Sequence, residues 1–234
     1  TAVLCTATQP ALGPLFQELA PGLTAQELSP DPALLYQVLR RVTLQDLDTV
    51  SMDALRKRLQ NVPQVLCVVN RRKTAQDLFD QLPAEGSYCL TTLLCAADRR
   101  RQLEEIRQRL KDGLPCRVVS TSLIEAGVDV DFPTVYRELA GLDSVLQAAG
   151  RCNREGLRPA DDSIVTIFER MELPPVLFRT AIGAAKEALE GGRDPAAPET
   201  MTRYFRALRS LTGEALDKQG VVKAFTDGIE GCEF

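Results

Sequence analysis

Histidine is absent from the 234-residue sequence, and its absence excludes several kinds of active site. Without an imidazole, the chain can form neither a Ser-His-Asp triad nor a Cys-His nucleophile pair. A metal nuclease that uses His and Asp ligands cannot lie within these residues either. Any chemistry must therefore rely on arginine, lysine, carboxylates, hydroxyl groups or backbone amides.

Long apolar runs and paired cysteines are also lacking. No stretch approaches the ~20 apolar residues that a membrane-spanning helix requires, and no basic segment followed by an apolar run resembles a secretory signal. The seven cysteines form no C-x-x-C pair, which is typical of buried thiols in a reducing compartment. We therefore expect a cytoplasmic protein with no membrane contact and no metal site.

The charges of the chain are nearly balanced, with 28 basic and 32 acidic residues and a net charge of -4. This balance excludes a histone-like, uniformly basic protein. It does not exclude nucleic-acid binding, because local donors within a cleft can bind phosphates. Basic residues cluster at 71–73 and 99–101, and we interpret the second cluster as a solvated helix surface.

Alternating strand and helix patterns predict a parallel α/β sheet. The run 65–69 is short and wholly apolar, as in a central strand that is buried on both faces. Asp31 and Ser51 are expected to cap helices that reach Leu39 and Leu59. Further strands are predicted at 41–45, 88–94, 116–121, 134–137 and 164–168, and helices at 74–82, 97–110 and 144–151. This alternation puts helices on both faces of the sheet.

Both ends of the chain depart from this alternation. The sequence begins at Thr1, without methionine and inside an apolar, strand-like run, so we expect a fragment of a longer protein. After Pro174 and Pro175 the strand pattern stops, and helices are predicted at 176–189 and 199–211. The sheet should therefore be followed by a small helical extension.

Polar residues follow two of the predicted strands at their carboxyl ends, where parallel sheets bind ligands. The segment 70–74 reads Asn-Arg-Arg-Lys-Thr, and the segment 120–129 carries hydroxyl groups, a glycine and two acidic residues. Exposed N–H groups and hydroxyls can hold phosphate oxygens without sequence preference. These two segments therefore predict a phosphate-binding edge.

The segment 147–154, Gln-Ala-Ala-Gly-Arg-Cys-Asn-Arg, is the most informative part of the sequence. Gln147 and Arg151 are four residues apart and would share a helix face, while Arg154 follows about one turn later. Two arginines directed at one point can neutralise charge on a transferring phosphoryl group. Taken alone, the pattern is more typical of a surface helix end whose arginines lie near the C-terminal dipole.

The order of these segments resembles motifs III to VI of superfamily-two helicases, namely Thr6-Ala7-Thr8, Asn70-Arg71, 120–129 and 147–154. Segments 120–133, 147–156, 199–205 and 213–217 further resemble the CRISPR-associated helicase-nuclease of type I interference systems. The resemblance implies an α/β, RecA-like parallel sheet with helices on both faces and a small helical extension. It implies a remnant of a first lobe at 1–20, a second lobe at 21–172 and the extension at 173–234.

The resemblance also implies a role for each matching residue. Catalytic roles are implied for Gln147, Arg151 and Arg154, of which Arg154 is the expected arginine finger. Roles in ATP binding, or in coupling ATP hydrolysis to strand movement, are implied for Thr6, Thr8, Gly127 and Asp129. Contacts with nucleic acid are implied for Asn70, Arg71, Thr74, Thr121 and Glu125.

Two motifs of such helicases are missing. The sequence contains neither the G-x-x-x-x-G-K-[ST] loop that cradles a triphosphate nor a D-E-x-[HD] segment for magnesium. We expect ATP and Mg to be bound mainly by a first lobe outside this chain, which alone should be inactive. The resemblance implies that the full protein unwinds and degrades foreign DNA, with single-stranded DNA and a guide-RNA effector complex as partners.

Two other interpretations stay open at this point. The chain could be a lobe of another superfamily-two DNA or RNA translocase, or a non-catalytic α/β module that binds nucleic acid or a protein. In the second case Arg151 and Arg154 would be scattered surface charges. The helicase interpretation instead expects both guanidinium groups and Asp129 to point to one edge of the sheet.

Overall fold

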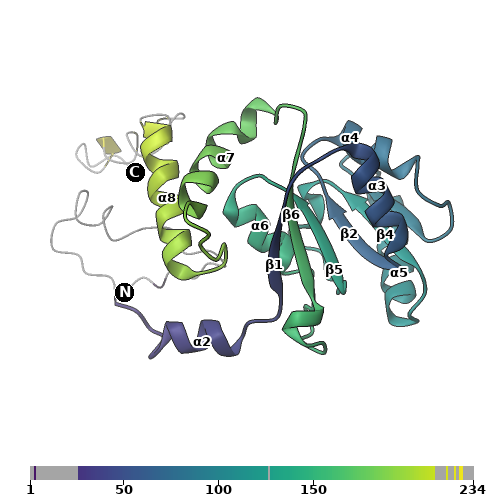
Figure 1. Cartoon of the computed structure of the whole chain (residues 1–234), viewed down its shortest axis with the longest axis horizontal. Coiled ribbons are helices and arrows are strands. Elements are labelled where there is room, and N and C mark those ends of the chain that lie inside the picture. Colours follow the sequence, from purple (N-terminus) through teal and green to yellow (C-terminus); the bar gives the residue numbers. More distant parts are fainter. Residues whose placement is uncertain are drawn as a thin grey trace.

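The computed structural model describes residues 26–125 and 127–213, with isolated positions at 3, 220, 224 and 227–228. In this part of the chain, six strands form one sheet in which all neighbours are parallel, in the order β1-β6-β5-β2-β4-β3 (Figure 1). The predicted parallel sheet is confirmed. The strands are β1 Thr43–Val50, β2 Gln64–Val68, β3 Ser87–Leu90, β4 Cys116–Ser120, β5 Thr134–Glu138 and β6 Ile164–Arg170.

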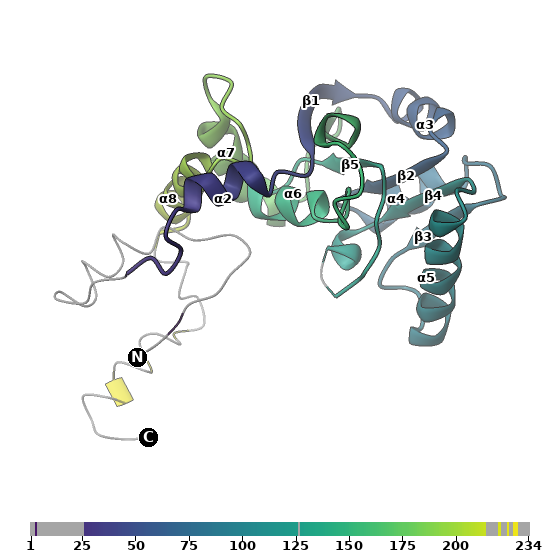
Figure 2. The ribbon, with the colours of Figure 1, turned by 90° about the horizontal axis from the view of Figure 1, so that it is seen from below.

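Helices cover both faces of the sheet (Figure 2). Helices α3 (Met52–Asn61) and α4 (Arg72–Phe79) pack on one face. Helices α5 (Ala96–Lys111) and α6 (Leu142–Ala149) pack on the other. No helix among the described residues is long and apolar enough to cross a membrane.

Strand β2 shows why the central strands are apolar throughout. Val65, Cys67 and Val69 point into the layer of α3 and α4, whereas Leu66 and Val68 point into the layer of α5 and α6. All five side chains are at most 1% exposed. Successive side chains of a strand point to opposite faces, so a strand covered on both sides needs an apolar residue at every position.

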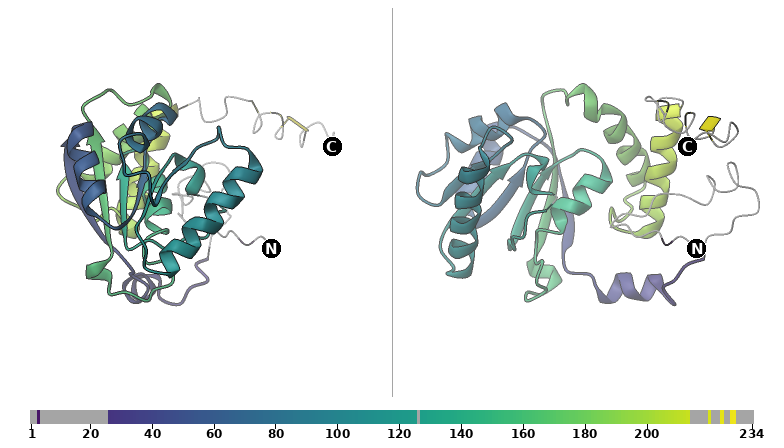
Figure 3. Two further views of the ribbon diagram at one scale, coloured as in Figure 1. Left: turned by 90° about the vertical axis from the view of Figure 1, so that its right-hand side faces the viewer. Right: turned by 180° about the vertical axis from the view of Figure 1, so that it is seen from behind.

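Helices α7 (Val176–Leu189) and α8 (Pro198–Thr212) form a pair beside α6 (Figure 3). Their apolar side chains join one cluster with α6 and with Ile167 of β6. The Tyr204 hydroxyl donates to Asp143 Oδ1 near the start of α6 over 2.7 Å. The two helices predicted after the sheet are confirmed, and they pack against it.

Two predicted caps are confirmed near the amino-terminal side. The Asp31 carboxylate accepts from the Leu34 N–H at the start of α2 (Pro32–Val38), over 2.9 Å. The Ser51 hydroxyl accepts from the Ala54 N–H at the start of α3, over 3.2 Å.

Several predicted boundaries were wrong. β1 begins at Thr43 and extends to Val50, with a register shift between Asp46 and Thr49, where Asp48 adopts a φ of 57°. β3 ends at Leu90 because Thr91 begins a turn that the Leu94 N–H closes. Helix α6 begins at Leu142 and ends at Ala149. Arg151 therefore lies beyond the helix, and the prediction that it shares a helix face with Gln147 is wrong.

Candidate functional site

The loop that carries Arg154 lies beside the start of β5. After α6 the chain runs next to Phe132, whose N–H donates to the Arg151 carbonyl over 2.9 Å. The Asn153 N–H donates back to the Phe132 carbonyl, also over 2.9 Å, and Phe132 and Cys152 form an isolated parallel bridge. Phe132 and Cys152 face the layer of α5 and α6. The loop is thus anchored on that side of the sheet, at the amino-terminal end of β5.

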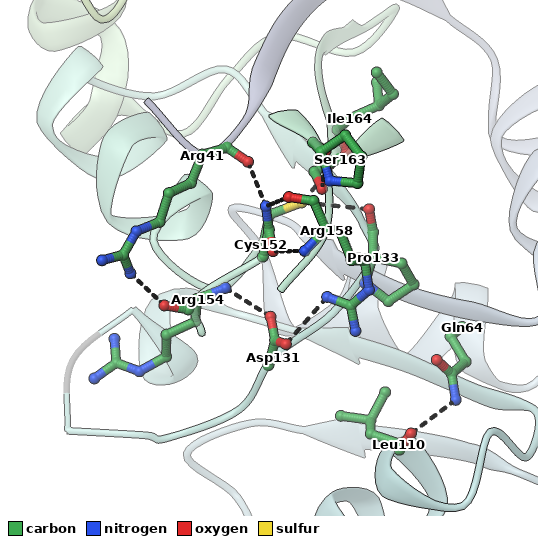
Figure 4. Close-up of polar contacts among 12 residues, drawn as sticks. Arg41, Gln64, Leu110, Asp131, Pro133, Cys152, Arg154, Arg158, Ser163 and Ile164 are labelled. Atoms are coloured by element: carbon green, nitrogen blue, oxygen red, sulfur yellow. Dashed lines mark hydrogen bonds and ion pairs between the residues drawn. The ribbon is translucent and has the colours of Figure 1, made fainter. Parts of the chain in front are cut away.

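The main chain of Arg154 is held on both sides, while its side chain stays open to solvent. Its N–H donates to Asp131 Oδ1 over 2.6 Å, and its carbonyl accepts from the Arg41 guanidinium (Figure 4). Asp131 Oδ2 also accepts from Arg158 over 3.0 Å. The Arg154 side chain is 43% exposed, and its Nε lies 2.6 Å from Asp129 Oδ1.

Asn153 was not singled out by the sequence analysis, yet it organises this loop. It is 1% exposed and has a φ of 46°, a left-handed conformation that asparagine tolerates better than most residues. Its Nδ2 donates to the carbonyls of Arg41 (2.8 Å) and Arg158 (2.7 Å), and its Oδ1 accepts from the Arg158 N–H over 3.0 Å. The sequence did carry a signal for Asn153, because an asparagine in a loop between two arginines suits a left-handed turn.

Arg151 differs from Arg154 in its surroundings. It is 8% exposed, and its guanidinium donates to the carbonyls of Ile124 (2.9 Å) and Glu125 (2.5 Å). Burial lowers its pKa, and the charge of Arg154 acts in the same direction. Its guanidinium therefore anchors the turn after β4. The resemblance implied instead that the guanidinium of Arg151 is open and faces ATP.

The remaining residues expected near ATP differ in exposure. Asp129 is exposed and paired with Arg154, Gly127 is exposed with a φ of 69°, and Gln147 is half-buried on α6. The charges of Arg154 and Asp129 both act on Arg151, so the three groups gather in one region. That region lies between the turn after β4 and the start of β5, on the side of the sheet that α5 and α6 cover. Thr6 and Thr8 lie outside the described residues.

At the carboxyl edge, Asn70 follows β2 and is held on three sides. Its N–H donates to Glu138 Oε2, its Nδ2 donates to the Leu139 carbonyl, and its Oδ1 accepts from Arg137, each over 2.8 Å. Arg137 is 1% exposed, and its Nε lies 2.9 Å from Glu125 Oε1. Glu125 thus pairs with a buried arginine that the sequence analysis missed; an arginine inside the predicted strand 134–137 was the available signal.

The other residues predicted to contact nucleic acid are partly enclosed. Thr74 is 3% exposed, and its hydroxyl accepts from Arg170, so in this arrangement it is closed to a phosphate. Thr121 is 9% exposed. Arg71 is more open, with a side chain 42% exposed, and its Nη2 donates to the Leu173 carbonyl over 2.7 Å. Of this set, Arg71 presents the most accessible charge.

The carboxylates near Arg154 are occupied by arginines. Asp129 pairs with Arg154, and Asp131 pairs with Arg158. Within the described part of the chain, no three His, Cys, Asp or Glu side chains gather as a metal site would require. The local chemistry is that of an exposed guanidinium on a fixed main chain, which suits an anion.

The sequence matches the Cas3 family, and solved Cas3 structures share its fold. The family model described as "CRISPR-associated nuclease/helicase Cas3, C-terminal" matches residues 61–157. The CRISPR-associated nuclease/helicase Cas3 of Methanothermobacter thermautotrophicus is 34% identical over 170 residues, which are 71% of this chain and 19% of that protein. The Cas3 of Haloferax volcanii is 52% identical over 103 residues, 42% of this chain and 11% of that protein. The chain belongs to the Cas3 family.

Solved structures agree with this assignment at the level of the fold. The crystal structure of T. fusca Cas3-ATP superposes with a TM-score of 0.62 at 16% identity, over 89% of this chain and 28% of that one. The sheet is RecA-like, and the chain corresponds to a C-terminal portion of Cas3. It spans less than a fifth of the length of the two Cas3 relatives compared by sequence.

Proposed function

We propose that this chain is the second RecA-like lobe of an ATP-dependent single-stranded DNA translocase. In this proposal residues 1–20 end the first lobe, 21–172 form the second and 173–234 form the extension. The observation that carries it is Arg154, whose main-chain N–H and carbonyl are both hydrogen-bonded while its side chain, paired with Asp129, stays 43% exposed. Such a group can neutralise charge on a phosphoryl group held by another lobe.

ATP would supply the transferring phosphoryl group, held with Mg mainly by the first lobe. In this chain Arg154 would approach the phosphates, and Asp131, Asn153 and Arg41 would keep its main chain in place. Arg71 would contact the phosphates of the single strand at the carboxyl edge. As part of Cas3, the intact cytoplasmic protein would unwind and degrade foreign DNA delivered by a guide-RNA effector complex.

The test compares the intact protein with this chain alone. We expect the intact protein to hydrolyse ATP faster when single-stranded DNA is added, and the isolated chain to hydrolyse none. Equal rates of ATP hydrolysis by the intact protein with and without single-stranded DNA would reject the proposal. Duplex DNA of the same sequence is the control for strand preference.

A further inference from the structure

Arg137 is a buried charge at the centre of the sheet. It lies in β5, between β6 and β2, and is 1% exposed. Its Nε lies 2.9 Å from Glu125 Oε1, and its Nη1 donates to Asn70 Oδ1 over 2.8 Å and to the Glu138 carbonyl over 2.5 Å. Burial lowers its pKa, and the charges of Glu125 and Glu138 oppose that effect.

Such a pair is a poor source of stability, because removing both charges from water costs about as much as their attraction returns. Its geometry is more informative than its energy. The planar guanidinium reaches Glu125 with one nitrogen and Asn70 with another. Glu125 follows β4, while Asn70 follows β2. Arg137 therefore links the side chains of Glu125 and Asn70, which the structure does not show bonded directly to each other.

The contacts continue to the loop that carries Arg154. Arg151 Nη2 donates to the Glu125 carbonyl over 2.5 Å, and Arg151 is three residues before Arg154. A continuous path thus runs from Arg151 through Glu125 and Arg137 to Asn70. It begins beside the exposed arginine and ends at the carboxyl edge of β2.

Asn70 ends this path with a donor that Arg137 orients. Its Nδ2 carries two N–H groups, and one of them is bonded to the Leu139 carbonyl. A phosphate offers acceptors only, so the second N–H is the side-chain group that Asn70 can donate to a strand. Because Arg137 holds Oδ1 of the same planar amide, it fixes the direction of that N–H, and a strand that moves the amide also moves Arg137.

We propose that Arg137 is a positioning residue that couples strand binding at Asn70 to the placement of Arg151 and the Arg154 loop. The inference rests on the proposed function, because it assumes that a single strand binds at this edge and that Arg154 serves ATP hydrolysis. Lysine cannot replace Arg137 here, because one ammonium group can satisfy Glu125 but not also bridge to Asn70.

The experiment measures the ratio of ATP hydrolysis with saturating single-stranded DNA to that without it, in the intact protein. Arg137→Lys should lower this ratio about fivefold or more. Arg117→Lys is the matched control, because Arg117 lies on β4 and donates to the carbonyls of Leu59 and Gln60, far from this path. It should keep the ratio within about twofold, whatever its effect on the melting temperature.

A double-variant cycle with Asn70→Ala separates coupling from general damage. If both residues act through one bridge, the combined variant should have the same ratio as the more affected single variant.

If Arg137→Lys does not fold, the Glu125→Gln variant is measured in its place, because glutamine keeps the shape of the Glu125 side chain and removes its charge. The inference alone would be overturned by a folded variant that keeps the wild-type ratio. It would also be overturned if the fold-changes of the ratio caused by Arg137→Lys and Asn70→Ala multiply in the combined variant. A wild-type protein with no response to DNA would overturn the proposed function with it.

Discussion

The guanidinium of Arg151 donates to the main-chain carbonyl of Glu125 over 2.5 Å. This bond separates the roles of the two arginines in the segment 147–154. Arg151 is 8% exposed and ties the end of α6 to the turn after β4. Arg154 keeps an accessible guanidinium on a fixed main chain, so the two residues should respond differently to substitution.

Arg154→Ala should reduce ATP turnover of the intact protein by roughly three orders of magnitude, as for other arginine fingers. DNA binding without nucleotide should change little, because the side chain lies near the start of β5, away from the carboxyl edge. Steady-state ATP hydrolysis and single-strand affinity measure the two effects. Arg99→Ala on the exposed side of α5 is the control. An Arg154→Ala rate within a few-fold of wild type would contradict the assignment.

Asn153→Ala should destabilise the protein by about 2–3 kcal/mol, because it removes three part-buried hydrogen bonds between the Asn153 amide and the main chain of Arg41 and Arg158. It also puts alanine at a φ of 46°. Asn153→Gly loses the same bonds without that strain, so it should be less harmful by roughly 1 kcal/mol. Urea denaturation gives both values. Equal stabilities of the two variants would argue against backbone strain at this position.

Arg71→Ala should weaken single-strand binding and flatten its salt dependence. Each lost phosphate contact lowers the slope of log affinity against log salt by about 0.7 for single strands. Arg71→Lys keeps the charge and should keep the slope, although it loses the bond to the Leu173 carbonyl. Titrations at several salt concentrations measure the slope. An unchanged slope for the alanine variant would exclude Arg71 from the phosphate contacts.

The raised pKa of Glu138 predicts that the free energy of unfolding depends on pH. Burial raises the pKa of its carboxyl, although the Asn70 N–H and Arg170 oppose this. Below about pH 4.3, the pKa of a glutamate in the unfolded chain, the Glu138 carboxyl is protonated in both the folded and the unfolded state, and stability does not change with pH on its account. As pH rises through the raised folded pKa, the native state must hold a buried carboxylate, so the wild type loses stability relative to Glu138→Gln. Urea denaturation of both proteins from pH 4 to 8 tests this. A difference that grows in the opposite direction would contradict it.

Most of the fold followed from local patterns. The run 65–69 predicted a doubly covered strand because every residue in it is apolar, and Asp31 and Ser51 predicted helix starts through short-range capping bonds. The end of α6 was missed, and with it the position of Arg151. That end depends on Phe132 and Cys152 pairing across twenty residues of chain, which no local pattern reveals.

The order and residue types of the polar segments were enough to assign the family and to single out Arg154 as the expected finger. Only the tertiary structure decided which of those residues are open to a ligand. Thr74 and Arg151 are enclosed by Arg170 and by the carbonyls after β4, while Arg154 remains accessible. Exposure depends on what distant segments pack against a side chain. For the same reason Arg137 and Asn153 were identified only once the chain was folded, because Arg137 bonds to Asn70 and Asn153 bonds to the Arg41 carbonyl, both far away in the sequence.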